Sequence, residues 1–190
     1  MKTPLISIKI FLFLTILTGI LYPLFITGLA QILFPAAANG SFLTNNNQIV
    51  GSVLIGQQFD SAIYFSSRPS AISYNPLPSG GSNFGLTNSK LKNLVTQRRE
   101  QFLSVNQLDS VTQIPSEMLF ASASGLDPHI SPEAAILQME RIAKARNFNN
   151  SQKQKLLKCI HELTESPQFF IFGEKRMNVL LLNLETDRIQ

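Results

Sequence analysis

Residues 10–34 read IFLFLTILTGILYPLFITGLAQILF, and this stretch decides how the chain is organised. It contains no Asp, Glu, Lys, Arg or His. At about 1.5 Å of rise per residue, a helix of this length is roughly 37 Å long, which is enough to cross a hydrocarbon layer about 30 Å thick. A backbone in lipid must satisfy its own polar groups, so we expect one transmembrane helix here.

The charged residues beside this segment predict its direction in the membrane. Lys2 and Lys9 precede it, whereas the first charged residue after it is Asp60. By the positive-inside rule, residues 1–9 lie in the cytoplasm and residues 35–190 lie on the other side of the cell membrane. The sequence therefore predicts a single-pass protein with an extracytoplasmic C-terminal part.

A cleaved signal peptide is an alternative interpretation of the same segment. The small residues Ala36, Ala37 and Ala38 follow a basic N-terminus and an apolar run, as they would at a cleavage site. The apolar core of a signal peptide is about 7 to 15 residues long, much shorter than residues 10–34, and this favours a retained anchor. Both interpretations export the rest of the chain.

Composition limits what the exported part can be. Residues 35–190 are enough for one ordinary domain. Without Lys2 and Lys9, the 16 Lys and Arg residues become 14 against 12 Asp and Glu, a net charge of +2. Because no basic run is interleaved with aromatic residues, we do not expect nucleic acid as a partner. The single cysteine, Cys159, allows no disulfide within the domain.

The first half of the exported part is expected to hold a linker, a strand and a long loop. Residues 35–48 are small or carry amides, which predicts a linker before a domain at 49–190. Ile49–Ile55 is β-branched without clean alternation, which predicts a strand buried on both faces. Residues 57–88 are rich in Pro, Gly, Ser and Asn, but their aromatic residues favour an ordered, functional loop over disorder. These aromatic residues are Phe59, Tyr64, Phe65, Tyr74 and Phe84.

Three amphipathic helices are predicted after the loop. Thr87 or Asn88 can cap the first one, which runs to about Leu103. The second has Ser131 as its N-cap, followed by Pro132 and Glu133, and runs to about Arg146. It is expected to bury Ala135, Ile136, Met139, Ile142 and Ala143. The third runs from Ser151 to Glu165, stops before Pro167, and buries Leu156, Ile160 and Leu163.

The C-terminal residues complete the predicted fold. Phe169–Phe172 is followed by Gly-Glu-Lys-Arg at 173–176, where we expect a turn. Met177–Leu184 reads MNVLLLNL and is apolar on both faces, which is typical of an inner strand covered by helices. Few strands and several helices in mixed order predict an α/β or α+β fold, with helices packed on a small mixed sheet.

One glycine-containing segment could present its backbone to an anion. In Pro78–Asn83, paired glycines allow successive N–H groups to converge, and the candidate residues are Ser79, Gly80, Gly81, Ser82 and Asn83. A tight turn that uses glycine for positive φ explains the same residues, and the Lys-Ser/Thr of a P-loop is absent. Both interpretations remain open.

A second polar cluster lies just before the second helix. Asp127 and His129, with Ser122 or Ser124 as nucleophile, would make a membrane-anchored hydrolase, but the sequence lacks a G-x-S-x-G elbow. An aspartate that binds its own backbone in a turn is the alternative. The two histidines and the cysteine do not have the spacing of zinc ligands, so no metal site is expected.

Several motifs carry a resemblance to a known family. In chain order they are LIGQQF (54–59), YFSSRPSA (64–71), YN (74–75), PSGGSNFGLTN (78–88), ASASGLDPHISPEAA (121–135), IAKAR (142–146) and GEKRMNVLLLNLE (173–185). Together they span nearly the whole chain and resemble the C subunit of the Kdp-type potassium-transporting ATPase. Two positions depart from that family's usual form, with Ala123 in place of a glycine and Leu86 in place of a proline.

The resemblance implies an accessory subunit without catalytic residues of its own. Its partners would be a channel-like subunit that binds potassium and a P-type subunit that hydrolyses ATP. The family's C subunit is described as a catalytic chaperone that raises the ATP affinity of the pump subunit. Expected partner contacts are Arg68, Tyr74, Asn75, Asp127 and His129.

The implied ATP role conflicts with the predicted topology. Ser79–Asn83 is similar to the SGG signature of transporter ATPases, yet an extracytoplasmic loop cannot reach cytoplasmic ATP. No firmly bound cofactor is expected, and ATP would act through the complex. A cap that stabilises the channel-like subunit near the entrance for potassium fits the topology better. A hydrolase and an anchored solute-binding module with an apolar pocket remain the alternatives.

Overall fold

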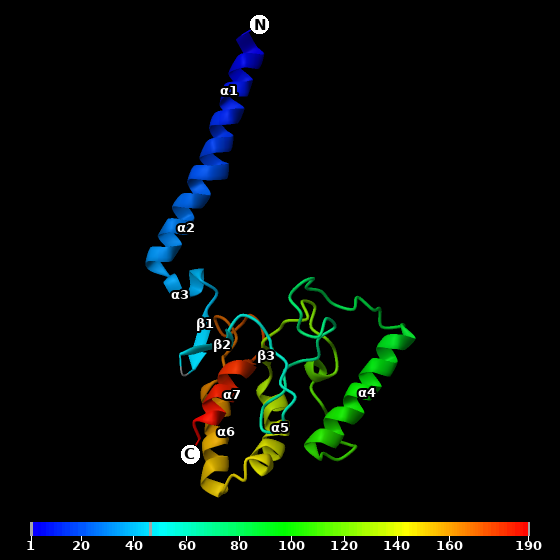
Figure 1. Ribbon diagram of the computed structural model, residues 1–190. Helices are drawn as coiled ribbons and strands as arrows, with labels where there is room; N and C mark the ends of the chain where they lie inside the picture. Colours follow the sequence, from blue (N-terminus) through cyan, green and yellow to red (C-terminus); the bar gives the residue numbers. More distant parts are fainter. Residues whose placement is uncertain (1, 46, 190) are drawn as a thin grey trace. The chain divides into compact units, whose positions relative to one another are not determined.

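The computed structural model describes residues 2–45 and 47–189, and the chain forms two compact units that divide between Ser52 and Val53. Both are drawn in Figure 1. Unit 1 contains α1 (Lys2–Ile16), η1 (Leu17–Leu21), α2 (Tyr22–Leu33), α3 (Pro35–Ala38), β1 (Phe42–Asn45) and β2 (Gln48–Ser52). Unit 2 contains α4 (Ser89–Asn106), η2 (Ser116–Met118), β3 (His129–Ile130), α5 (Pro132–Ala145), α6 (Asn150–Glu162), β4 (Met177–Asn178) and α7 (Val179–Asp187).

The predicted transmembrane helix is present in unit 1. Among the described residues, the continuous helix Thr3–Leu33 is the one helix that is long and apolar enough to cross a membrane, by its length and composition. Its central turn, η1, is π-helical and comes just before Pro23, whose ring removes the N–H that a regular helix would use. The helix ends at Phe34, where φ is −138°.

A β-hairpin lies where the sequence predicts a linker followed by a buried strand. Residues 35–48, expected to be a linker, contain α3 and β1. The strand predicted at Ile49–Ile55 is instead β2, which ends at Ser52 and pairs antiparallel with β1. It is not buried on both faces, because it belongs to a two-stranded hairpin, and Ile49 is 66% exposed.

Unit 2 is built around three neighbouring helices. Helices α5, α6 and α7 lie side by side, and α4 also packs against α5 (Figure 1). Their inward residues form one apolar core with a residue of the long loop, Phe65, which is fully buried. The other core residues are Phe102, Met118, Ile130, Ala134, Ala135, Ile142, Leu156, Ile160, Met177, Val179 and Leu182.

Side-chain caps fix where these helices begin, as the sequence predicts. The Asn88 side chain accepts the N–H of Lys90 at the start of α4, and Ser131 accepts that of Ala134 at the start of α5. Helix α6 begins with a capping box between Asn149 and Gln152. One predicted core residue is wrong, because Ile136 lies on the outer side of α5 and is 42% exposed.

The C-terminal segment differs most from its prediction. Met177–Leu184 is not an inner strand, since β4 has two residues and α7 follows it directly. The Asn178 side chain accepts the N–H of Leu181 and caps α7, which turns the apolar run into a buried helix. The turn predicted at 173–176 lies earlier instead, at Phe169–Ile171.

The predicted class of fold is confirmed: helices are combined with small sheets, and one N-terminal helix is long and apolar enough to span a membrane. The sheet of unit 2 pairs β3 with β4 antiparallel, so that His129 lies opposite Asn178 and Ile130 opposite Met177. The loop at 57–88 has no helix or strand, as expected. Its conformation must therefore be fixed by contacts other than a sheet.

Candidate functional site

Two buried amide side chains hold the start of the long loop. The N–H of Phe65 donates to Asn183 Oδ1 (2.7 Å), and Asn183 Nδ2 donates back to the Phe65 carbonyl (3.0 Å). Gln138 holds Ser66 in the same way: the N–H of Ser66 donates to Gln138 Oε1 (2.8 Å), and Gln138 Nε2 donates to the Ser66 carbonyl (3.5 Å). An amide side chain supplies one donor and one acceptor as a neighbouring strand would, so α7 and α5 replace a sheet partner here.

Arg141 of α5 and Arg146, the residue that follows this helix, fix the loop segment before Phe65. Arg141 is 8% exposed and donates to the carbonyls of Ala62 (2.6 Å) and Tyr64 (3.0 Å). Arg146 donates to the carbonyl of Ile63 (2.8 Å). Charged donors satisfy three successive loop carbonyls, which makes the loop an ordered part of unit 2.

An ion pair between Arg68 and Asp127 forms the centre of the candidate site. Arg68 Nη1 lies 2.5 Å from Asp127 Oδ2, and the two side chains are 24% and 27% exposed. The other carboxylate oxygen, Oδ1, accepts the backbone N–H of His129 (3.0 Å) and lies 3.4 Å from His129 Nδ1. The structure thus brings three of the five predicted contact residues together.

This environment keeps Asp127 ionised. Partial burial opposes the charged form, but hydrogen bonds from His129 and the charge and hydrogen bond of Arg68 outweigh it, lowering the pKa of Asp127 to about 2. Asp127 is therefore an anion at neutral pH and not a proton donor. Arg68 retains one buried donor atom, Nε, that has no hydrogen-bond partner among the described residues.

Tyr74 supports Arg68 from the same loop. Its hydroxyl donates to the backbone carbonyl of Arg68, and Ser70 Oγ accepts the N–H groups of Ile72 (3.2 Å) and Tyr74 (2.9 Å). Burial raises the pKa of Tyr74 to about 12, so the phenol stays neutral and remains a donor. Asn75 is exposed beside it, where its side chain accepts the N–H of Leu77 (3.1 Å).

The glycine-containing segment lies against residues 122–125. Ser79 Oγ (2.9 Å) and the N–H of Gly80 (3.1 Å) both donate to the carbonyl of Ser124. A Cβ added at Gly81 would lie 3.1 Å from the Ala123 carbonyl oxygen, so this glycine permits close approach of two backbones. Neither Gly80 nor Gly81 has a positive φ, while Ser82 and Asn83 are exposed.

The serines near His129 are engaged elsewhere. The N–H of Ser122 donates to the Pro69 carbonyl (3.3 Å), and Ser124 Oγ accepts the N–H of Leu126 (3.1 Å). No hydrogen bond between His129 and either hydroxyl occurs within residues 2–45 and 47–189, and no group of three potential metal ligands occurs there either. The arrangement provides no nucleophile and base pair.

Sequence reasoning missed residues that position the site. A Cβ at Gly56 would lie 2.5 Å from the Asp127 carbonyl oxygen, so only glycine fits where this segment passes the ion pair. Gln138 and Asn183 also escaped notice, although each is a polar residue at a helical position otherwise filled by core residues. A polar residue on an apolar helix face is the signal that could have identified them.

Arg68 lines several open pockets. One has a volume of about 490 Å³ and is lined by Arg68, Asp127 and His129, together with the charged side chains of Glu117, Glu174, Lys175 and Arg176. A second, about 330 Å³, is lined by Arg68, Tyr74 and Arg98 among others. The first of these pockets is lined mainly by charged and polar side chains, unlike the largely apolar pocket expected of a solute-binding module.

Fold and site together define a class of protein, a domain that follows a helix able to span a membrane and that carries an ordered, ion-paired loop. The family described as K⁺-transporting ATPase, c chain, matches residues 5–188. The chain belongs to this family, as the resemblance of its motifs implies.

Relatives of this chain are similar to it over nearly their full length. The potassium-transporting ATPase KdpC subunit of Photorhabdus laumondii is 44% identical over 186 residues, covering 96% of this chain and 94% of its own. The corresponding subunit of Polynucleobacter asymbioticus is 46% identical over 183 residues, covering 94% of each chain. That of Geobacter metallireducens is 45% identical over 187 residues, covering 96% of each.

Proposed function

We propose that this chain is the accessory, non-catalytic subunit of an ATP-driven potassium-uptake complex in the cell membrane. Membership of the c-chain family over residues 5–188, and the names of its relatives, support a role in potassium transport. Its partners in this proposal are a channel-like subunit that binds potassium and a P-type subunit that hydrolyses ATP. Its task is to stabilise their assembly.

The Arg68–Asp127 ion pair is the observation that carries this proposal. Arg68 lies on a loop fixed by buried side chains of α5 and α7, and both members of the pair line a pocket with charged walls. An ordered polar surface without a nucleophile and base pair suits recognition of another subunit. The unpartnered Nε of Arg68 leaves the guanidinium with capacity for one more acceptor if the site adjusts on binding.

We further propose that residues 35–190 are extracytoplasmic and that the helix is a retained anchor. The basic Lys2 and Lys9 precede the span, and the first charged residue after it is Asp60. The family match begins at residue 5 and so includes the span, which supports retention over cleavage.

In this topology any effect on ATP affinity is indirect. Ser79 and Gly80 already donate to the Ser124 carbonyl, which favours a role of this segment in joining two loops. A chaperone effect on the ATPase subunit would then pass through the membrane helices as a coupling between distant sites. We expect Ser82→Ala and Asn83→Ala to leave unchanged the ATP concentration that gives half-maximal activity of the complex. A clear rise would support direct contact.

Copurification after detergent extraction tests the subunit role. The tagged wild-type chain should recover large membrane partners with potassium-stimulated ATPase activity. Arg68→Ala should lower this recovery, whereas Lys153→Ala, which removes a surface ion pair with Glu140, should not. Thermal unfolding of each variant checks that the domain remains folded. If the wild-type chain emerges alone, without such activity, the proposal is wrong.

A further inference from the structure

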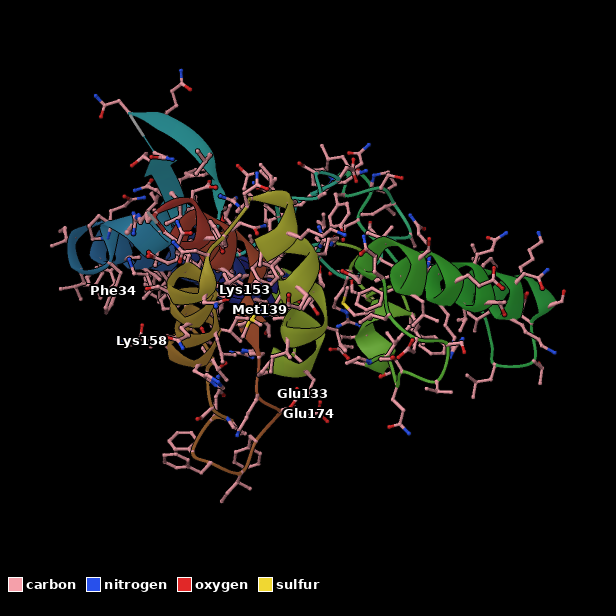
Figure 2. All side chains as sticks on the ribbon, turned by 90° about the horizontal axis from the view of Figure 1, so that it is seen from below. Phe34, Glu133, Met139, Lys153, Lys158 and Glu174 are labelled. Carbon is pink, nitrogen blue, oxygen red and sulfur yellow. The ribbon has the colours of Figure 1, made fainter. Side chains whose placement is uncertain are left out.

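Four consecutive large apolar side chains are exposed at one end of unit 2. Phe169, Phe170, Ile171 and Phe172 are 83%, 88%, 78% and 66% exposed. They lie at the tip of the loop between α6 and β4, which we call the apolar tip (residues 169–172). In Figure 2 this loop extends away from helices α5 and α6, with aromatic rings at its end and Glu174 on its returning arm.

The apolar tip is held in a defined shape. Gln168 and Phe172 exchange two backbone hydrogen bonds of 2.9 Å, and a second backbone pair joins Glu165 and Arg176 at 2.7 and 3.2 Å. An ion pair of 3.1 Å between the same two side chains closes the base of the loop. These contacts fix the backbone of the loop that carries the apolar tip.

Exposed apolar groups of this size mark a contact with something other than water. The four exposed apolar residues follow one another without a polar residue between them, and the charged residues Glu165, Lys175 and Arg176 lie at the base of the loop. A protein partner would need a socket, that is, a cavity that encloses the whole apolar tip. Lipid chains can pack around a projecting group of any shape.

The turn at the tip satisfies three of its backbone N–H groups internally. A backbone that enters hydrocarbon must satisfy its own polar groups. The N–H of Phe170 donates to the Pro167 carbonyl (2.9 Å), and the N–H groups of Ile171 (3.2 Å) and Phe172 (2.9 Å) donate to the Gln168 carbonyl. Charged residues at the base, Lys175 and Arg176, can remain in the headgroup layer.

The chain itself keeps unit 2 near a bilayer. The helix that can span the membrane ends at Leu33, and unit 2 begins at Val53. Even fully extended, residues 34–52 reach roughly 65 Å, and α3 and the hairpin shorten this reach. A tethered surface meets the bilayer at high effective concentration, so a small insertion is enough to hold it there.

We propose that the apolar tip inserts into the interfacial region of the bilayer that holds the anchor helix. Unit 2 would then have two attachments to the membrane, the span and the tip, which restrict its rotation about the tether. This inference does not depend on the subunit role or on which side of the membrane unit 2 lies.

Depth-dependent quenching in the full-length protein tests this contact. Phe170→Cys in a Cys159→Ser background is labelled with an environment-sensitive fluorophore, and the chain alone is reconstituted into phosphatidylethanolamine and phosphatidylglycerol vesicles. Leu86→Cys, at a loop position that is 90% exposed, is the matched control. Circular dichroism checks that both labelled chains are folded.

We expect emission from the label at position 170 to move to shorter wavelength and to be quenched by lipids that carry a nitroxide near the headgroup. The label at 86 should show neither change. The proposal would be overturned if the label at 170 emitted at the same wavelength as the label at 86, which would mean that both are exposed to water. A shift at 170 that occurs only with partner subunits, without quenching by lipid nitroxide, would also overturn it and indicate a protein socket instead.

Discussion

Asn183 on α7 forms two hydrogen bonds with the backbone of Phe65, a residue 118 positions earlier in the chain. Both residues are buried, with exposed fractions of 2% and 0%. The amide therefore fixes the start of the 57–88 loop from inside the core. The ion pair at Arg68 is three residues further along the same backbone.

The first prediction concerns this amide. Asn183→Leu keeps a similar volume but leaves the buried N–H and carbonyl of Phe65 without partners, so we expect a loss of about 2 to 3 kcal/mol in the free energy of unfolding. Urea denaturation of the wild-type and variant proteins in detergent measures this difference in the free energy of unfolding. Asn93→Leu, on the exposed side of α4, should change stability by less than about 0.5 kcal/mol. Equal effects of the two substitutions would contradict the assigned role.

The second prediction is a pH dependence at Asp127. Its pKa in the folded protein is about 2, below the value near 3.9 of an unfolded aspartate. The stabilisation is therefore complete above about pH 4 and is lost as pH falls towards 2, by an amount of about 2 kcal/mol.

Unfolding free energies between pH 5 and pH 2 test this dependence. Asp127→Asn should be less stable than wild type at pH 5, and the difference should shrink as the pH falls, because the variant has no carboxylate to protonate. Substitution of the exposed Asp109 by Asn controls for the loss of one negative charge. A constant difference across the range would show that Asp127 acts through packing alone.

The third prediction compares two glycines of the joined loops. Gly125 has a φ of +71°, and a Cβ there would lie 2.5 Å from Ile72 Cγ1 and 2.9 Å from the Gly80 carbonyl oxygen. Gly125→Ala should lower stability by at least about 1 to 2 kcal/mol. Gly80 has open space around its Cβ position, so Gly80→Ala should be close to neutral. Thermal unfolding of the two variants checks this order, and the reverse order would refute the geometry.

The fourth prediction places the loop relative to the membrane. In a Cys159→Ser background, Leu86→Cys should react with a membrane-impermeant thiol reagent in intact cells, since Leu86 is 90% exposed and the positive-inside rule puts it outside. Thr3→Cys, on the other side of the span, should react only after the cells are opened. Labelling of position 86 only in opened cells would place unit 2 in the cytoplasm and make direct contact between Ser79–Asn83 and ATP the leading mechanism.

The sequence by itself determined the features that depend on nearby residues. An uncharged run needs no remote partner to be recognised as a membrane helix. The starts of α4 and α5 follow from the caps Asn88 and Ser131, whose hydrogen bonds close within three residues. The candidate contact residues Arg68, Asp127 and His129 could also be named, because their motifs resemble a known family.

Only the tertiary structure decided how these residues meet. Arg68 and Asp127 are 59 positions apart, and their contact depends on a loop held by side chains of α5 and α7. Apart from Asn178 and Asn183 the run at 177–184 is apolar, which suits a buried helix as well as an inner strand. The Asn178 cap and burial of Val179, Leu182 and Asn183 select the helix. Periodicity cannot make that choice, since a segment enclosed by neighbours on all sides has no polar face to reveal its period.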